Sequence, residues 1–259
     1  MSIVQKDKDD DKGGFPIIRL LPNMVTIIGL CLGLFAIKYA MSQQWHISVM
    51  LIIIAAFVDG IDGRLARMLN ASSDFGAQLD SFTDFVNFGV APALTLYMWK
   101  GHEIKGLGWA MALFFIISMT LRLARFNVGL SDDEQDPEMR DKFFQGMPAP
   151  CGGAVSLIPM ILTFLFEAKL GYQPFEITAV MVILYMAVVS IMTVSSIPTI
   201  SVKKVKIPRK LVPLFMAVAA LFIISLIIEP WITLPLLGLS YLSTIPFSIW
   251  QYYKISNKK

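Results

Sequence analysis

Five aspartates lie within a short stretch of the chain, DGIDGRLARMLNASSDFGAQLDSFTD, which covers residues 59–84, and four of them form two close pairs. Asp59 and Asp62 are three residues apart, and Asp80 and Asp84 are four residues apart. On a helix, either spacing places both side chains on one face. The link between the two pairs is short, so both pairs can converge at one depth of the molecule. The stretch therefore predicts a cluster of four carboxylates.

Such a cluster needs compensation, because like charges repel one another and a carboxylate at a membrane boundary loses hydration. Two solutions are open: some carboxyl groups are protonated, or divalent cations lie among them. An all-oxygen ligand set suits hard ions such as Mg²⁺, Ca²⁺ or Mn²⁺. Two such ions would suit phosphoryl-type transfer, because they polarise a phosphate, orient a nucleophile and stabilise a leaving group.

Small and basic residues are interleaved with the aspartates. Gly63, Ala66 and Gly76 leave room beside the carboxylates. The planar guanidinium of Arg67 can bind a phosphate through two parallel hydrogen bonds. Asp74 lies off the pattern and is expected to be a solvated loop residue. Helix capping or a salt-bridged face explains one or two aspartates, but is a poor explanation for four with interleaved glycines.

The elements that position these residues are expected to be membrane helices. The chain is 56% hydrophobic and only 16% charged, with a mean hydropathy of +0.65, whereas a soluble domain is about a quarter charged. The apolar residues form long runs, which predicts an all-α polytopic membrane protein. We expect eight transmembrane helices: Met24–Met41, Ile47–Met68, Phe82–Trp99, Leu107–Phe126, Pro150–Phe166, Phe175–Ile197, Leu211–Ile228 and Ile232–Tyr252.

The distribution of positive charge predicts the topology. If both termini are cytoplasmic, all but four of the 22 Lys and Arg residues fall on the cytoplasmic side, as the positive-inside rule requires. We expect a disordered cytoplasmic tail (1–14), a six-helix catalytic membrane core (15–200) and two additional C-terminal transmembrane helices (201–259). The aspartates then lie at the cytoplasmic face.

The spacing D-x2-D-G-x2-A-R-x8-G-x3-D-x3-D, met in full between residues 59 and 84, resembles the signature of the CDP-alcohol phosphotransferases. The resemblance implies that all four aspartates bind two divalent ions and that Asp84 is also the base that activates the acceptor hydroxyl. It implies a nucleotide site at the positions that match the family's glycine, alanine and arginine: Gly63, Ala66, Arg67 and Gly76.

Four further segments resemble phosphatidylserine synthases of the membrane-embedded type: Phe75–Ala93, Leu121–Asn127, Phe144–Pro150 and Pro22–Thr26. The last segment is similar to the family's first helix near the CDP phosphates, which adds Asn23 and Thr26 to the expected nucleotide site. Asn87 departs from the pattern, because serine is expected there.

The resemblance implies transfer of the phosphatidyl group from CDP-diacylglycerol to L-serine, giving phosphatidylserine and CMP, with Mg²⁺ or Mn²⁺ as the cofactor. It implies a homodimer that crosses the cytoplasmic membrane of a prokaryote several times, with the site facing the cytoplasm, and no nucleic-acid partner.

Arg122 and Arg125 are candidates for binding the serine carboxylate, because they are three residues apart on the fourth expected helix. They could equally anchor the helix on lipid phosphate. Choline, glycerol 3-phosphate and an inositol phosphate remain alternative acceptors. A divalent-cation transporter is the alternative of another class, but the acids lie at the cytoplasmic end without matching polar residues across the outer half.

Overall fold

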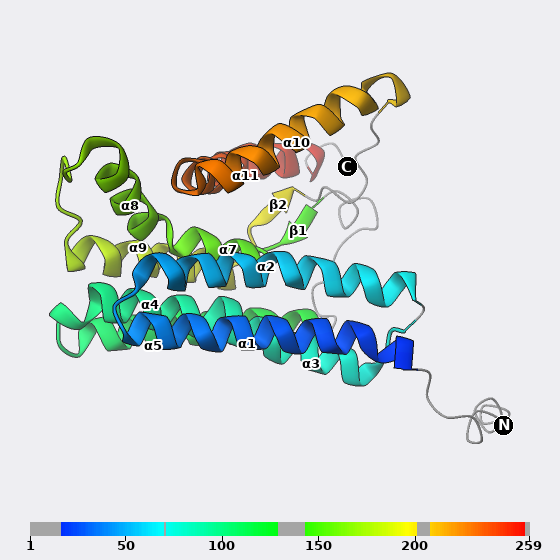
Figure 1. Ribbon diagram of the computed structural model, residues 1–259, viewed down its shortest axis with the longest axis horizontal. Coiled ribbons are helices and arrows are strands. Elements are labelled where there is room, and N and C mark those ends of the chain that lie inside the picture. Colours follow the sequence, from blue (N-terminus) through cyan, green and yellow to red (C-terminus); the bar gives the residue numbers. More distant parts are fainter. Residues whose placement is uncertain (1–16, 70, 129–142, 201–207, 257–259) are drawn as a thin grey trace, which may run out of the picture.

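The computed structural model describes residues 17–69, 71–128, 143–200 and 208–256. This part of the chain is almost entirely helical and contains one two-stranded antiparallel ribbon (Figure 1). The predicted all-α fold class is confirmed. The predicted tail, residues 1–14, lies outside the described residues.

The first half of the chain forms long helices close to the expected spans. The third expected span starts earlier than predicted, at Asp74, because Ser73 caps the helix: its Oγ accepts a hydrogen bond from the Gly76 N–H at 3.0 Å. Asp74 is exposed, as expected, but it is the first residue of a helix rather than part of a loop. The elements are η1 (Ile17–Leu20), α1 (Leu21–Met41), α2 (Trp45–Met68), α3 (Asp74–Asp84), the π-helix η2 (Phe85–Val90), α4 (Ala91–Trp99), η3 (Gly101–Glu103) and α5 (Leu107–Asn127).

The second half departs further from the prediction. The fifth expected span is not one straight helix, because α7 and α8 meet at a 46° bend beside Leu157. Pro159, in the first turn of α8, lacks the N–H that a continuous helix would use. The elements are β1 (Phe143–Gln145), α7 (Ala149–Ser156), α8 (Ile158–Leu170), α9 (Ala179–Val194), β2 (Pro198–Ile200), η4 (Arg209–Leu211), α10 (Val212–Ile228) and α11 (Pro230–Ser256).

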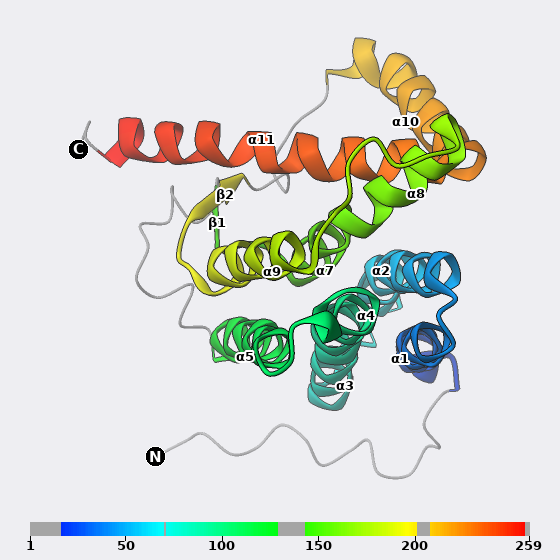
Figure 2. The same ribbon diagram turned by 90° about the vertical axis from the view of Figure 1, so that its left-hand side faces the viewer.

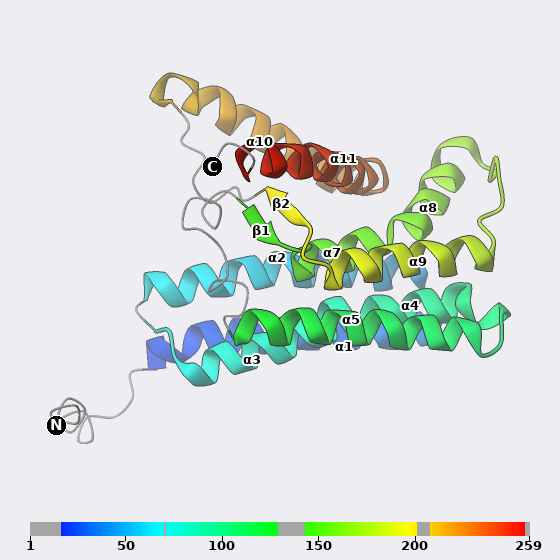
Figure 3. The same cartoon turned by 180° about the vertical axis from the view of Figure 1, so that it is seen from behind.

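The helices form a bundle with an additional pair outside it. Figure 2 looks along the bundle, so that α1, α2, α5 and α9 are seen end-on, while α11 runs across them. Figure 3 shows the β1–β2 ribbon between the bundle and the α10–α11 pair. The ribbon pairs Phe144 with Thr199, and so brings the segment before α7 together with the segment after α9.

The interior of the bundle is apolar and closely packed. Phe88, Phe115, Met119 and Leu157 are almost completely buried in one continuous core. Many large apolar side chains instead point outward, and no residue of α10 is buried. An apolar exterior of this extent is typical of a protein surrounded by lipid.

Three described helices are long and apolar enough to cross a membrane, and the bent α7–α8 pair can provide a fourth. The three are α1, α5 and most of α11. These spans support a multi-pass membrane protein; the full set of eight spans and the cytoplasmic termini remain predictions.

The π-helix η2 packs closely against α1. Asn87, in η2, is completely buried against Gly33 and Gly29. A Cβ added at Gly33 would overlap the Asn87 side-chain amide, so only glycine allows this approach. Because η2 directly follows Asp84, this contact fixes the helix that carries the fourth aspartate.

Candidate functional site

Three of the predicted metal ligands come together between α2 and α3. Asp59, Asp62 and Asp80 each offer a carboxylate oxygen, and these oxygens all lie within 4.8 Å of one another. Asp62 is only 4% exposed, and the other two are half-buried. The convergence expected from the sequence spacing is therefore present in the structure.

Asp84 joins the cluster through Asp59. It is the last residue of α3, and its carboxyl group lies within hydrogen-bonding reach of the Asp59 carboxyl. Its Oδ1 atom is buried and has no hydrogen-bond partner among the described residues. A buried polar atom without a partner costs about 1–3 kcal/mol, so this oxygen is suited to a proton or a ligand.

Thr26 of α1 orients one of the carboxylates. Its hydroxyl lies 2.7 Å from Asp62 Oδ2, to which it donates, and 3.0 Å from the Pro22 carbonyl. This contact joins α1 to α2 inside the site. The prediction assigned Thr26 to the nucleotide, whereas the structure also shows it holding a predicted metal ligand.

The donor set fits hard divalent cations. Within the described ranges, none of the four aspartates has an ion-pair partner, and Arg122 is the cation whose charge acts on Asp59 and Asp84. One positive side chain cannot balance four carboxylates. The cluster could therefore hold metal, with carboxylate oxygens only.

A pocket of about 170 Å³ opens beside the carboxylates. It contains five of the six residues predicted to bind the nucleotide. Arg67 is not among the lining residues and lies exposed in the last turn of α2. The lining residues are Pro22, Asn23, Thr26, Asp62, Gly63, Ala66, Ala71, Ser72, Ser73, Gly76, Ala77 and Asp80.

The glycines of the pocket act in two ways. A Cβ added at Gly63 would meet nothing within 4 Å, so a larger side chain there would extend into open space. A Cβ added at Gly76 would come within 3.0 Å of Asn23 Oδ1 and 3.2 Å of Ser73 Oγ. Gly76 therefore lets α1 approach the first turn of α3.

The pocket also meets the N-terminus of α3, a contribution that the sequence analysis missed. Ser72 and Ser73 line it, and the helix begins at Asp74. The N-terminus of a helix attracts anions through its unpaired N–H groups and its dipole. The S–S–D–F–G sequence at residues 72–76 is a helix-start signal that would have located this position.

The two predicted acceptor-binding arginines have different surroundings. Arg122 donates from Nε to the Met147 carbonyl at 2.7 Å and lies within electrostatic range of Asp84. Arg125 donates to the Val194 and Ser195 carbonyls and to Ser196 Oγ, at 3.2–3.3 Å. Arg122 therefore lies within electrostatic range of the carboxylate cluster, whereas Arg125 connects α5 to the end of α9.

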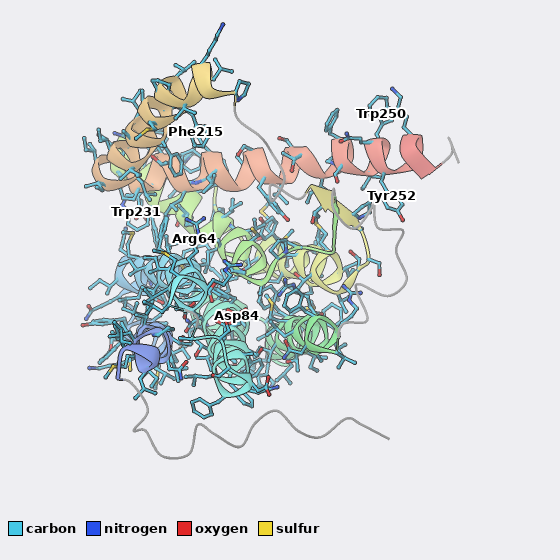
Figure 4. All side chains as sticks on the ribbon, turned by 90° about the vertical axis from the view of Figure 1, so that its right-hand side faces the viewer. Arg64, Asp84, Phe215, Trp231, Trp250 and Tyr252 are labelled. Atoms are coloured by element: carbon cyan, nitrogen blue, oxygen red, sulfur yellow. The ribbon has the colours of Figure 1, made fainter. Side chains whose placement is uncertain are left out.

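Asn87 is a further residue to which the sequence analysis assigned no role. Both polar atoms of its side-chain amide, and the neighbouring Thr83 Oγ1, are buried without hydrogen-bond partners in the described structure. The Gly29-x3-Gly33 spacing on α1 was the available signal, because small residues at this interval allow close helix packing. Figure 4 shows Asp84, just before η2, in the interior of the bundle.

Comparison with known proteins identifies the family of the chain. Residues 19–173 match the family model CDP-alcohol phosphatidyltransferase, and residues 210–246 match CDP-alcohol phosphatidyltransferase 2. A Mycobacterium bovis protein named CDP-diacylglycerol–serine O-phosphatidyltransferase is 36% identical over 90% of this chain and 79% of its own.

Two relatives with the same name come from other bacteria. The Helicobacter pylori protein is 33% identical over 75% of this chain and 77% of its own. The Bacillus subtilis protein is 37% identical over 58% of this chain and 78% of its own. With the motif, the carboxylate cluster and these matches together, the chain belongs to the CDP-alcohol phosphatidyltransferase family.

Proposed function

We propose that this protein transfers the phosphatidyl group of CDP-diacylglycerol to the hydroxyl of L-serine, giving phosphatidylserine and CMP. The observation that carries the proposal is the carboxylate cluster opening onto a pocket lined by the residues of the family motif. The relatives named for this reaction support the choice of both substrates.

The nucleotide would occupy the pocket between α1, α2 and α3. Gly63 and Ala66 leave space for it on α2, and Asn23 of α1 and Gly76 of α3 also line the pocket. The N-terminus of α3 favours the negative charge of the diphosphate there. Arg67, exposed at the end of α2, is proposed to reach the phosphates from outside the pocket.

Asp59, Asp62, Asp80 and Asp84 would hold two divalent ions, Mg²⁺ or Mn²⁺. Bound there, the ions would neutralise the diphosphate and stabilise the departing CMP. Thr26 keeps Asp62 in a fixed orientation for this role, because its hydroxyl donates to that carboxylate.

Asp84 is proposed to act as the general base. The serine hydroxyl gives its proton to the Asp84 carboxylate, and its oxygen forms a bond to the lipid-linked phosphorus. The bond from that phosphorus to the bridging oxygen breaks, and CMP leaves with the electron pair. The buried, unpartnered Oδ1 of Asp84 supports this role, since it is an acceptor with no competing donor among the described residues.

The serine carboxylate would lie on the opposite side of Asp84 from the nucleotide, near Arg122. Of the two candidate arginines we place Arg122 first, because Arg125 already donates to three acceptors. The site is proposed to face the cytoplasm, because serine and CMP are dissolved there. The homodimer implied by the family resemblance remains a prediction.

The test is CMP release from CDP-diacylglycerol by the purified full-length protein with Mn²⁺ or Mg²⁺. Serine is compared with choline, glycerol 3-phosphate and an inositol phosphate. We expect release with serine, and its loss in Asp59→Asn. The matched control is Asp74→Asn, which changes an exposed aspartate of the same stretch and is expected to retain activity.

Release with another alcohol alone would retain the aspartate chemistry and refute serine as the acceptor. No release with any acceptor, from folded protein, would refute the proposed reaction.

A further inference from the structure

Tyr241 lies in α11, one of the two helices whose role the sequence leaves open. Its hydroxyl is buried and makes no hydrogen bond within the described part of the chain. A buried tyrosine hydroxyl usually has a hydrogen-bond partner, and leaving it without one is unfavourable. The missing partner therefore needs an explanation.

The surroundings of this hydroxyl belong to the proposed acceptor site. Tyr241 lies within electrostatic range of Arg122 and of the Cys151 thiol of α7. Thr199 is also close. Its hydroxyl donates to the Gly146 carbonyl at 2.8 Å, and its oxygen could still accept, but it does not meet hydrogen-bond geometry with the Tyr241 hydroxyl. Gly146 directly precedes Met147, whose carbonyl accepts from Arg122, so α11 places a phenol in the neighbourhood of this arginine and within its electrostatic range.

Arg122 has unused donors at the same place. Its Nε is engaged by the Met147 carbonyl, whereas its two terminal NH₂ groups have no hydrogen-bond partner among residues 17–69, 71–128, 143–200 and 208–256. A guanidinium fork suits the two oxygens of a carboxylate. The buried Tyr241 hydroxyl and the half-buried Arg122 guanidinium thus have donors without an acceptor among the described residues, and an anionic group from outside the chain would suit both.

The position of Tyr241 is fixed by the packing of α11. Ser248 donates from Oγ to the Pro198 carbonyl of β2 at 2.7 Å. Gly238 lies against Ile158 of α8, where an added Cβ would come within 2.6 Å of the Ile158 side chain. Ile245, one turn after Tyr241, is buried. A phenol held on both sides in this way can discriminate between ligands.

We propose that Tyr241 is an acceptor-binding residue, whose hydroxyl donates a hydrogen bond to the carboxylate of the acceptor alcohol alongside the Arg122 guanidinium. The acceptor then spans the site, with its hydroxyl at Asp84 and its carboxylate at Arg122 and Tyr241. The inference rests on the proposed function and assigns α11 a part in choosing the acceptor.

The test measures acceptor binding without turnover. Full-length protein with Mn²⁺ and CMP is titrated with serine or with ethanolamine, which has the hydroxyl and the amine but lacks the carboxylate, and thermal stabilisation gives each dissociation constant. In Tyr241→Phe we expect about 10-fold weaker serine binding, the effect of one hydrogen bond to a charged group, and unchanged ethanolamine binding.

The matched control is Tyr185→Phe. Tyr185 is also a largely buried tyrosine, but its hydroxyl donates to the Val155 carbonyl at 2.8 Å. This variant should lose thermal stability and keep the wild-type affinity for serine.

The inference is overturned if Tyr241→Phe binds serine as tightly as the wild type, if it weakens serine and ethanolamine equally, or if serine does not stabilise the wild type. CMP release is measured on the same preparations. Serine binding that depends on Tyr241, without serine-dependent CMP release, would refute the proposed reaction and leave the binding inference supported.

Discussion

Replacing Thr26 by valine tests whether α1 holds the carboxylate cluster in place. Valine keeps the shape of threonine but removes the hydroxyl that lies 2.7 Å from Asp62 Oδ2. A hydrogen bond to a charged group contributes about 1.5–3 kcal/mol. If this hydrogen bond stabilises only the orientation of Asp62 that binds metal, its loss weakens metal binding by the same free energy. The affinity for metal then falls about 10- to 100-fold.

The assay is the Mn²⁺ concentration that gives half-maximal CMP release at saturating CDP-diacylglycerol and serine. Mn²⁺-dependent thermal stabilisation provides a second readout that needs no turnover. We expect both to move to higher Mn²⁺ in Thr26→Val, with most of the maximal rate recovered at saturating metal.

Thr163→Val is the matched control. Thr163 is 5% exposed, like Thr26, and its hydroxyl donates to the Met160 carbonyl of its own helix at 2.7 Å. It should leave the metal dependence unchanged. If Thr26→Val instead raised the KM for CDP-diacylglycerol at constant metal dependence, Thr26 would contact the nucleotide and our account of Asp62 would be wrong.

Three further substitutions test other parts of the structure. Asp84→Asn should lower the maximal rate of CMP release by about 10²–10⁴-fold, the contribution typical of a general base, while CMP binding persists; retained turnover would contradict the base assignment. Gly63→Leu should raise the KM for CDP-diacylglycerol without unfolding the protein, because the new side chain enters open space; equal effects in Gly60→Leu, on an exposed position of the same helix, would refute this explanation. Gly33→Ala should destabilise the protein by about 1–3 kcal/mol, measured by thermal unfolding, because the new methyl group overlaps Asn87; unchanged stability would show that η2 can move away from α1.

The aspartate cluster was predictable because its geometry is largely local. Helix periodicity alone places Asp59 beside Asp62, and Asp80 beside Asp84. The short link between the pairs restricts where they can lie, and three of the four expected carboxylates form one group, with Asp84 beside Asp59. Five of the predicted nucleotide-site residues also line one pocket, since most of them belong to the same two helices.

Other contacts were not predictable, because they join residues far apart in the sequence. Thr26 and Asp62 are 36 residues apart, and their hydrogen bond depends on how α1 packs against α2. The different surroundings of Arg122 and Arg125 depend on the placement of α7 and α9. Sequence spacing gives both arginines the same helix face and cannot tell them apart.

Hydropathy and helix periodicity are local properties of the chain, so the all-α membrane fold, the helical pairing of the carboxylates and the family motif could be predicted without a structure. The break between α7 and α8, the course of α11 across the bundle and the placement of Tyr241 within electrostatic range of Arg122 became visible only in the three-dimensional fold. These features arise from packing between segments that are far apart in the chain, and helix periodicity, which describes only near neighbours, does not determine which distant segments meet.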